Sequence, residues 1–188
     1  MTSTKTISTI PEIEKPDRAL RLIEAGNSWG DRITKDVANA ALTYTVSGKG
    51  LGSVGTELRA GKHVFHIDEP AALAGDDAAA SPVEVALGAF IACQIVVYRL
   101  YAQLLGIPID SIEATAEGDL DVRGLFGMDK SIRPGFSSIR LTVAIQGPET
   151  EEKYAELQEV VDQNCPIQDL FANRTPITAT LVSNNKTR

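Results

Sequence analysis

Cys93 and Cys165 are the only cysteines of this chain, and they are the residues whose type and surroundings could do chemistry. Cys165 directly precedes Pro166, and a proline in the first helical turn would make Cys165 a helix N-cap residue. Free backbone N–H groups at such a position stabilise a thiolate, so local chemistry favours Cys165 as the more acidic thiol. An ordinary cysteine in a turn remains an alternative. Cys93 lies in the middle of an apolar helical segment, where buried cysteines are commonly inert, so a reactive role and a packing role both stay open.

Glu84 is the acidic group nearest to the start of that helical segment. It follows Ser81 by three residues, with Pro82 between them, so a capping box explains it without any catalytic role. At about 100° per residue, Glu84 and Cys93 fall on opposite faces of the helix. A contact between them would need a bend at the helix start or a second subunit.

Other kinds of site find no support in the sequence. His63 and His66 point to opposite faces of a predicted strand, and no CxxC pair is present, so we expect no metal. The glycines of residues 47–55 form no nucleotide-binding motif. We therefore expect no bound cofactor.

Charge and composition narrow the class of protein further. The chain has 188 residues, and 43% of them are hydrophobic, which is enough for a full core. Its net charge of -7 argues against nucleic-acid binding. The N-terminus has no apolar run, and the longest one, residues 83–97, is interrupted by Glu84 and Gln94 and is too short to span a bilayer. We expect a cytoplasmic protein with no membrane partner, in which two cysteines are reactive or inert rather than permanently bridged.

Hydrophobic periodicity and turn residues predict an α+β fold. Strands are expected at residues 41–47, 53–59, 63–67, 111–122, 138–146 and 177–182, with a turn at 48–52. Helices are expected at residues 17–28, 82–105, 150–163 and 166–172. We divide the chain into an N-terminal extension, residues 1–38, partly disordered with a short helix, and one domain, residues 39–188.

Two motifs resemble the OsmC/Ohr family, the osmotically inducible and organic hydroperoxide resistance proteins. They are DEP…SPVEVALGAFIAC, ending at Cys93, and NCPI…TPITATLV, which contains Cys165, in the family's order. Residues 120–136 resemble a connection in a less characterised, OsmC-like branch. The resemblance implies an intertwined homodimer, with two long helices per subunit packed between curved antiparallel sheets and the active sites at the interface.

The resemblance also implies a thiol peroxidase for organic hydroperoxides. On this view Cys93 becomes a sulfenic acid, Cys165 closes a disulfide, and an external dithiol, either a small molecule or a lipoylated protein, reduces it. Cys93 would then be the more reactive thiol, in contrast to the ranking from local chemistry, and a cation from the second subunit could lower its pKa.

The chain departs from the family pattern at two positions. Well-studied members have a glutamate directly after the motif's proline and an arginine in the turn after the first strand. Here Val83 follows Pro82, with Glu84 one place later, and the turn holds Lys49. Glu84 and Lys49 are the candidate replacements. Arg59 is the arginine nearest to the turn, and Arg123 or Arg133 could substitute for the missing one. The rival hypothesis is a non-catalytic member that binds an apolar ligand or senses oxidants through Cys93.

Overall fold

The computed structural model describes residues 10–183, so part of the predicted loose N-terminal tail lies outside the described residues. Four helices form one part of the molecule, α1 (Lys15–Lys35), α2 (Pro82–Leu105), α4 (Glu151–Asn164) and α5 (Pro166–Ala172). Two antiparallel sheets complete it, β1 (Val46–Leu51), β2 (Gly55–Ala60) and β3 (His63–Ile67) in one, and β4 (Ser111–Asp119) and β5 (Ser138–Gln146) in the other. Short helical turns occur at α3 (Val122–Leu125), η1 (Val37–Ala40) and η2 (Ala71–Leu73). The predicted α+β class is confirmed.

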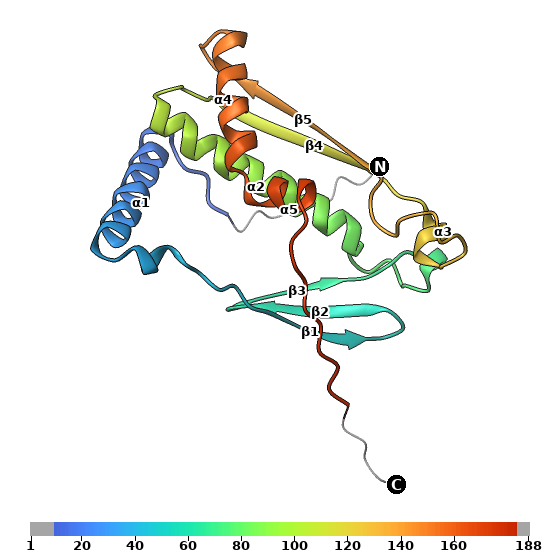
Figure 1. The fold of residues 1–188 in the computed structure, drawn as a ribbon. Helices are drawn as coiled ribbons and strands as arrows, with labels where there is room; N and C mark the ends of the chain where they lie inside the picture. Colours follow the sequence, from blue (N-terminus) through green and yellow to red (C-terminus); the bar gives the residue numbers. More distant parts are fainter. Residues whose placement is uncertain (1–9, 184–188) are drawn as a thin grey trace.

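Helix α2 runs through the middle of the molecule and carries the core (Figure 1). It begins at a full capping box, in which Ser81 accepts from the Glu84 N–H and Glu84 accepts from the Ser81 N–H. It ends at Gly106, whose φ of 68° is the left-handed conformation that glycine adopts without strain. Buried side chains of α2 and α4 meet in the core, among them Phe90, Val97, Tyr98, Leu157 and Val161.

The β4–β5 sheet covers one side of α2. Its burial alternates strictly along both strands, and Ile112 pairs with Ile145. The half-buried side chains, including Leu141 and Val143, pack against the core. This is the period-two pattern that predicts a strand with one buried face.

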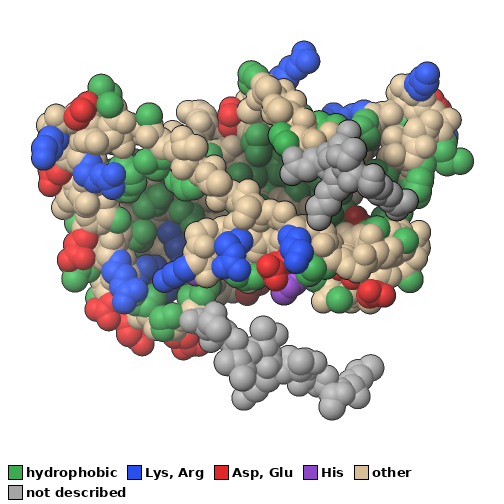
Figure 2. Space-filling model, turned by 90° about the horizontal axis from the view of Figure 1, so that it is seen from below, with side chains coloured by type: hydrophobic (Ala, Val, Ile, Leu, Met, Phe, Trp, Pro, Cys, Tyr) green, Lys and Arg blue, Asp and Glu red, His purple; other side chains and the backbone are tan. Residues whose placement is uncertain are grey.

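The three-stranded sheet, β1–β2–β3, lies apart from the helices (Figure 1). Every residue of β1 is exposed, as are Val64 and Phe65 of β3. Figure 2, which views the molecule from below, shows hydrophobic side chains in the hollows of this face. The predicted turn at residues 48–52 is wrong, because β1 continues to Leu51 and the chain turns at residues 52–54. Gly48 and Gly50 suggested a turn, but both lie in strand register opposite β2.

Helix α1 is longer than the short helix that the sequence predicts. Gly26 and Asn27 suggested a helix end, but the helix continues to Lys35, where the Asp36 N–H donates to the Arg32 carbonyl. Its side chains Leu22 and Ile23 lie beside Leu100 and Leu104 of α2. Packing against a second helix therefore outweighs the weak helix propensity of two residues.

The predicted strand at residues 177–182 is not formed, and this prediction is wrong for the described chain. Ile177 is 88% exposed and Leu181 is 92% exposed. The sequence is suited to a strand, but a strand needs a neighbour to accept its backbone hydrogen bonds.

The expectation that no segment is long enough to cross a bilayer is also wrong. Helix α2 has 24 residues and is long and apolar enough to do so by length and composition alone. Core helices of soluble proteins pass the same test, and α2 packs against α4, α5 and β4.

Candidate thiol site

The fold brings Cys93 and Cys165 together. Cys93 lies on α2, and Cys165 lies between α4 and α5, as the C-cap of one helix and the N-cap of the other. Cys165 is 2% exposed and belongs to the core, against which the half-buried Cys93 packs. Both thiols are free, and the side chain of Cys165 interacts directly with that of Cys93. Residues far apart in the sequence thus form one dithiol.

Burial raises the pKa of the Cys93 thiol, and burial is the largest effect on it. A backbone hydrogen bond from the Ile167 N–H acts in the opposite direction and lowers that pKa, whereas the neighbouring Cys165 raises it. The net result is a thiol that is harder to ionise than an ordinary cysteine.

The first turn of α5 provides a backbone hydrogen bond to Cys93, and not to Cys165 as the sequence predicts. Cys165 is the N-cap of α5, as the sequence predicts, but its side chain makes no capping hydrogen bond. The Ile167 N–H instead hydrogen-bonds to Cys93. The backbone group expected to stabilise a Cys165 thiolate therefore serves Cys93, and no sequence signal identified Ile167.

Gln94 and Gln168 connect the two cysteine-bearing regions. Gln94 is 0% exposed, and its Nε2 donates to Oε1 of Gln168 on α5 at 2.5 Å. Its own Oε1 is buried and has no hydrogen-bond partner within residues 10–183. Buried amides need partners, so this bond holds α2 and α5 in register beside the thiols. The sequence showed Gln94 only as an interruption of an apolar run.

Glu84 is occupied at the helix start. Its Oε2 accepts from the Ser81 N–H at 2.8 Å and from the Ser81 Oγ at 2.6 Å. These bonds lower the pKa of the Glu84 carboxyl, with the Ser81 hydroxyl as the first cause. No hydrogen bond joins Glu84 to Cys93 in the described part of the chain, so the capping interpretation accounts for its contacts.

Lys49 contacts neither Cys93 nor Cys165 of its own chain. It is an exposed residue of β1, opposite Glu57 of β2, and none of its recorded contacts reaches either cysteine. Among the arginines, Arg59 is exposed on β2 and Arg123 pairs with Asp121 at 2.6 Å. Neither of these arginines is joined to the dithiol by a hydrogen bond or ion pair that the described residues make.

Arg133 lines a cavity of about 810 Å³ that lies against α2 and α5. Aromatic side chains from three segments form its apolar walls, namely Phe90, Phe136 and Phe171, and Phe90 meets Phe171 edge to face with ring centroids 5.7 Å apart. Tyr98 and Asp162 line it too, and burial, followed by the charge of Asp162, raises the pKa of Tyr98 to about 12. Gln168 belongs to this cavity as well, so the same side chain contacts Gln94 and the cavity.

Residues 10–183 contain no group of three or more His, Cys, Asp or Glu side chains that could hold a metal ion. The site brings together two adjacent thiols, of which Cys165 is buried and Cys93 is half-buried.

Comparison with known proteins identifies the fold. The family model described as OsmC-like protein matches residues 75–180. An OsmC-like protein from Mycoplasma pneumoniae aligns with a TM-score of 0.62 and 17% identity, covering 70% of this chain and 88% of that one.

Two organic hydroperoxide resistance proteins are also similar in structure. The protein from Legionella pneumophila is 20% identical with a TM-score of 0.54, covering 69% of this chain and 89% of its own. The protein from Elizabethkingia anophelis is 21% identical with a TM-score of 0.54, covering 69% and 88%. No curated protein matches the sequence.

Proposed function

The chain belongs to the OsmC-like protein family, and on that basis we propose that it is a thiol-dependent peroxidase that reduces organic hydroperoxides. The observation that supports this proposal most directly is the contact between Cys93 and Cys165 in the core. A peroxidase of this kind needs a thiol that attacks and a second thiol within reach of the first.

In the first step the Cys93 thiolate attacks the terminal oxygen of the hydroperoxide. A sulfur–oxygen bond forms, the oxygen–oxygen bond breaks, and the alkoxide leaves and takes up a proton to become an alcohol. Cys93 is then a sulfenic acid. The hydrogen bond from the Ile167 N–H is positioned to stabilise the thiolate before attack.

In the second step the Cys165 thiolate attacks the oxidised sulfur of Cys93. A disulfide forms and the hydroxyl group leaves as water after protonation. An external dithiol then returns two electrons and two protons, and becomes a disulfide itself. The chain needs no metal or organic cofactor for this cycle.

We also propose that the working form is a homodimer, because the isolated chain leaves much apolar surface uncovered. Helix α2 exposes Val96 by 56% and Leu104 by 75%, and the β1–β2–β3 sheet has an exposed strand and exposed Phe65. Such surface is typical of protein interfaces. A second copy would also provide the exposed segment 177–182 with a possible strand neighbour, and would be the source of any cation, Lys49 included, that reaches Cys93 from the β1–β2–β3 sheet.

The alternative function is binding of an apolar ligand or sensing of oxidants without turnover. The cavity of about 810 Å³ with aromatic walls favours it, as does the raised pKa of Cys93. Neither Glu84 nor Lys49 contacts the dithiol within one chain, which is consistent with slow catalysis or none.

A steady-state assay with an organic hydroperoxide and a dithiol reductant separates the two functions. We expect turnover by the wild type, none by Cys93→Ser, and a single turnover that stops at the sulfenic acid in Cys165→Ser. Thiol titration should show two free thiols per chain before peroxide and none after one equivalent. Equal peroxide consumption by the wild type and Cys93→Ser would rule out the peroxidase and leave the ligand-binding function.

A further inference from the structure

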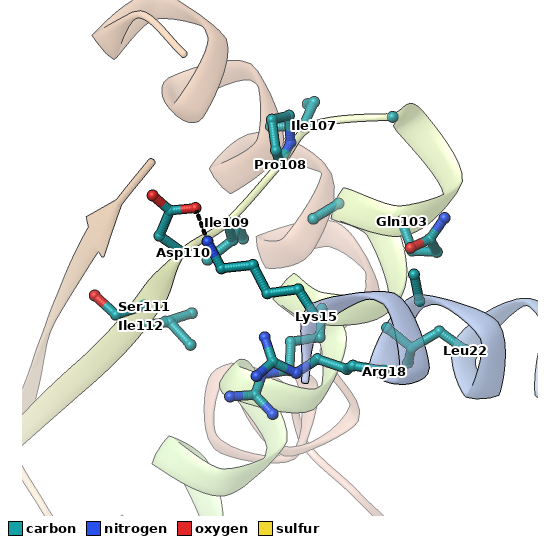
Figure 3. A pocket seen from close by; sticks show the side chains of 14 residues that line it. Lys15, Arg18, Leu22, Gln103, Ile107, Pro108, Ile109, Asp110, Ser111 and Ile112 are labelled. Atoms are coloured by element: carbon teal, nitrogen blue, oxygen red, sulfur yellow. Dashed lines mark hydrogen bonds and ion pairs between the residues drawn. The ribbon is translucent and has the colours of Figure 1, made fainter. Parts of the chain in front are cut away.

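A second cavity lies away from the dithiol, between α1, the C-terminal half of α2 and the start of β4. We call it the α1 cavity; its volume is about 360 Å³, which is within the range of small-molecule sites. Three cationic side chains line it, Lys15 and Arg18 from α1 and Arg99 from α2. Figure 3 shows Lys15 and Arg18 extending from α1 toward the residues that lead into β4. Aliphatic side chains, including Leu22 and Ile112, line it too, together with the polar side chains of Gln103, Asp110 and Ser111.

Within residues 10–183, only one of these three cations forms an ion pair. Lys15 Nζ donates to Asp110 Oδ1 at 2.6 Å, and the pair is visible in Figure 3. Arg18 reaches the Ile13 carbonyl at 3.4 Å, and its Nε is buried with no hydrogen-bond partner in the described chain. Arg99 likewise has a buried, unpartnered Nε and no ion pair within residues 10–183.

The two arginines are close enough to repel one another. The pKa of Arg99 is lowered, first by burial and then by the charge of Arg18. A buried N–H without a partner and two like charges side by side each cost free energy. The chain carries a net charge of -7, yet none of its described acidic groups pairs with either guanidinium. An anion that accepts from both would remove all of these costs at once.

We propose that the α1 cavity binds a small phosphate monoester, with Arg18 and Arg99 both donating to the phosphate and a short organic group resting on Leu22 and Ile112. Two unneutralised guanidinium groups match the charge of a phosphate monoester, which is about −1.5 to −2 at neutral pH. The planar fork of an arginine also suits two phosphate oxygens.

This site is independent of the proposed peroxidase. Helix α1 precedes the residues matched by the family model, so the α1 cavity depends on a segment that the match does not include. A bound phosphate would hold α1 against the helix that carries Cys93.

The test is a calorimetric titration of the full-length protein with inorganic phosphate, phenyl phosphate and the dicarboxylate malonate, all at one ionic strength. We expect saturable binding of both phosphates, tighter for phenyl phosphate, and weak or no binding of malonate. Arg99→Gln and Arg18→Gln should each weaken binding about tenfold or more, because each removes a charge-assisted donor. Circular dichroism of each variant checks that it is folded, and Arg99→Lys, which keeps the charge but loses the fork, should bind more weakly than the wild type.

Arg21→Gln is the matched control, since Arg21 is an exposed arginine of the same helix that does not line the cavity. It should bind phosphate as the wild type does. No saturable binding by the wild type, or an equal loss in Arg21→Gln, would overturn the site. Tighter binding of malonate than of either phosphate would overturn the assignment to a phosphate ligand.

Discussion

At the residue scale, the reactivity of the site depends on how much thiolate Cys93 carries at neutral pH. Burial and Cys165 both disfavour the thiolate, and among residues 10–183 only the Ile167 N–H favours it. The first two effects prevail, so the neutral thiol dominates near pH 7. The proposed cycle should therefore be limited by ionisation of Cys93.

The first prediction concerns the pH dependence of that ionisation. In Cys165→Ser, the rate of sulfenic acid formation should rise about tenfold per pH unit from about pH 6 toward alkaline pH and flatten only above the ordinary thiol pKa. The sign follows from the raised pKa, because each increase in pH recruits more of the reactive thiolate. Stopped-flow measurement with excess hydroperoxide gives the profile, with glutathione as the reference thiol. A plateau already below pH 7 would mean that a cation lowers the pKa, and would contradict the prediction.

The second prediction separates the capping role of Glu84 from a catalytic one. Ser81→Ala removes one half of the capping box and should lower the free energy of unfolding by about 1 kcal/mol. Glu84→Ala should cause a loss of similar size, measured by urea denaturation. Both variants should keep the wild-type rate of peroxide consumption. A large drop in rate for Glu84→Ala, with normal activity in Ser81→Ala, would instead show that Glu84 takes part in catalysis.

The sequence identified part of the site and missed the rest for a physical reason. Both cysteines, the capping box and the N-cap position of Cys165 follow from local signals, and the structure confirms the two helix positions. The Ile167 bond to Cys93 and the Gln94–Gln168 pair depend on how α5 lies against α2. Contacts between elements that are far apart in the sequence produce no periodic pattern in it, so the sequence alone does not predict them.

At the scale of elements, the best predictions are those in which local signals agree with packing. The bounds of β3, β5 and α5 are as predicted, because alternation or a proline start coincides with non-helical, non-strand residues on either side. The end of α1 and the start of the turn after β1 were misplaced at glycines. A glycine makes a helix less favourable by about 1 kcal/mol than an alanine does. Packing against another helix, or pairing with another strand, can offset the unfavourable effect of a glycine.

The third prediction tests the junction of α2 and α4. Leu157 on α4 is 0% exposed, so Leu157→Ala should leave a cavity and destabilise the protein by about 2–5 kcal/mol. The control is Leu20→Ala on α1, where the side chain is 55% exposed and the change should be within about 0.5 kcal/mol. Chemical denaturation followed by circular dichroism measures both. Equal losses would contradict the placement of the core.

At the scale of the whole molecule, the isolated chain has two incomplete parts. The β1–β2–β3 sheet is largely exposed and segment 177–182 is extended without a strand partner. Sequence analysis predicted a strand there because the alternation is strand-like, but it cannot reveal which neighbour the strand needs. Local sequence patterns do not show whether the pairing strand comes from the same chain or from a partner chain.

The fourth prediction tests the proposed dimer. Light scattering should give about twice the 20.1 kDa of one chain for the wild type. Val96→Glu places a charge on the exposed apolar face of α2, where Val96 is 56% exposed, and should shift the mass toward one chain. Val37→Glu is the control, because Val37 is 76% exposed but lies in η1, outside α2. A wild type that scatters as a single chain at all concentrations would rule out the dimer.

The position of the two cysteines has a topological consequence. Joining Cys93 to Cys165 would enclose β4, β5 and α4 in one covalent loop, since all three lie between them in the sequence. On the chain-entropy model, closing a loop of this length restricts the unfolded chain enough to add about 4 kcal/mol to the free energy of unfolding. A change of that size would raise the melting temperature by several degrees or more. The oxidised protein would then melt at a higher temperature than the reduced one. The fraction of protein that stays folded on heating would therefore report the fraction that peroxide has oxidised.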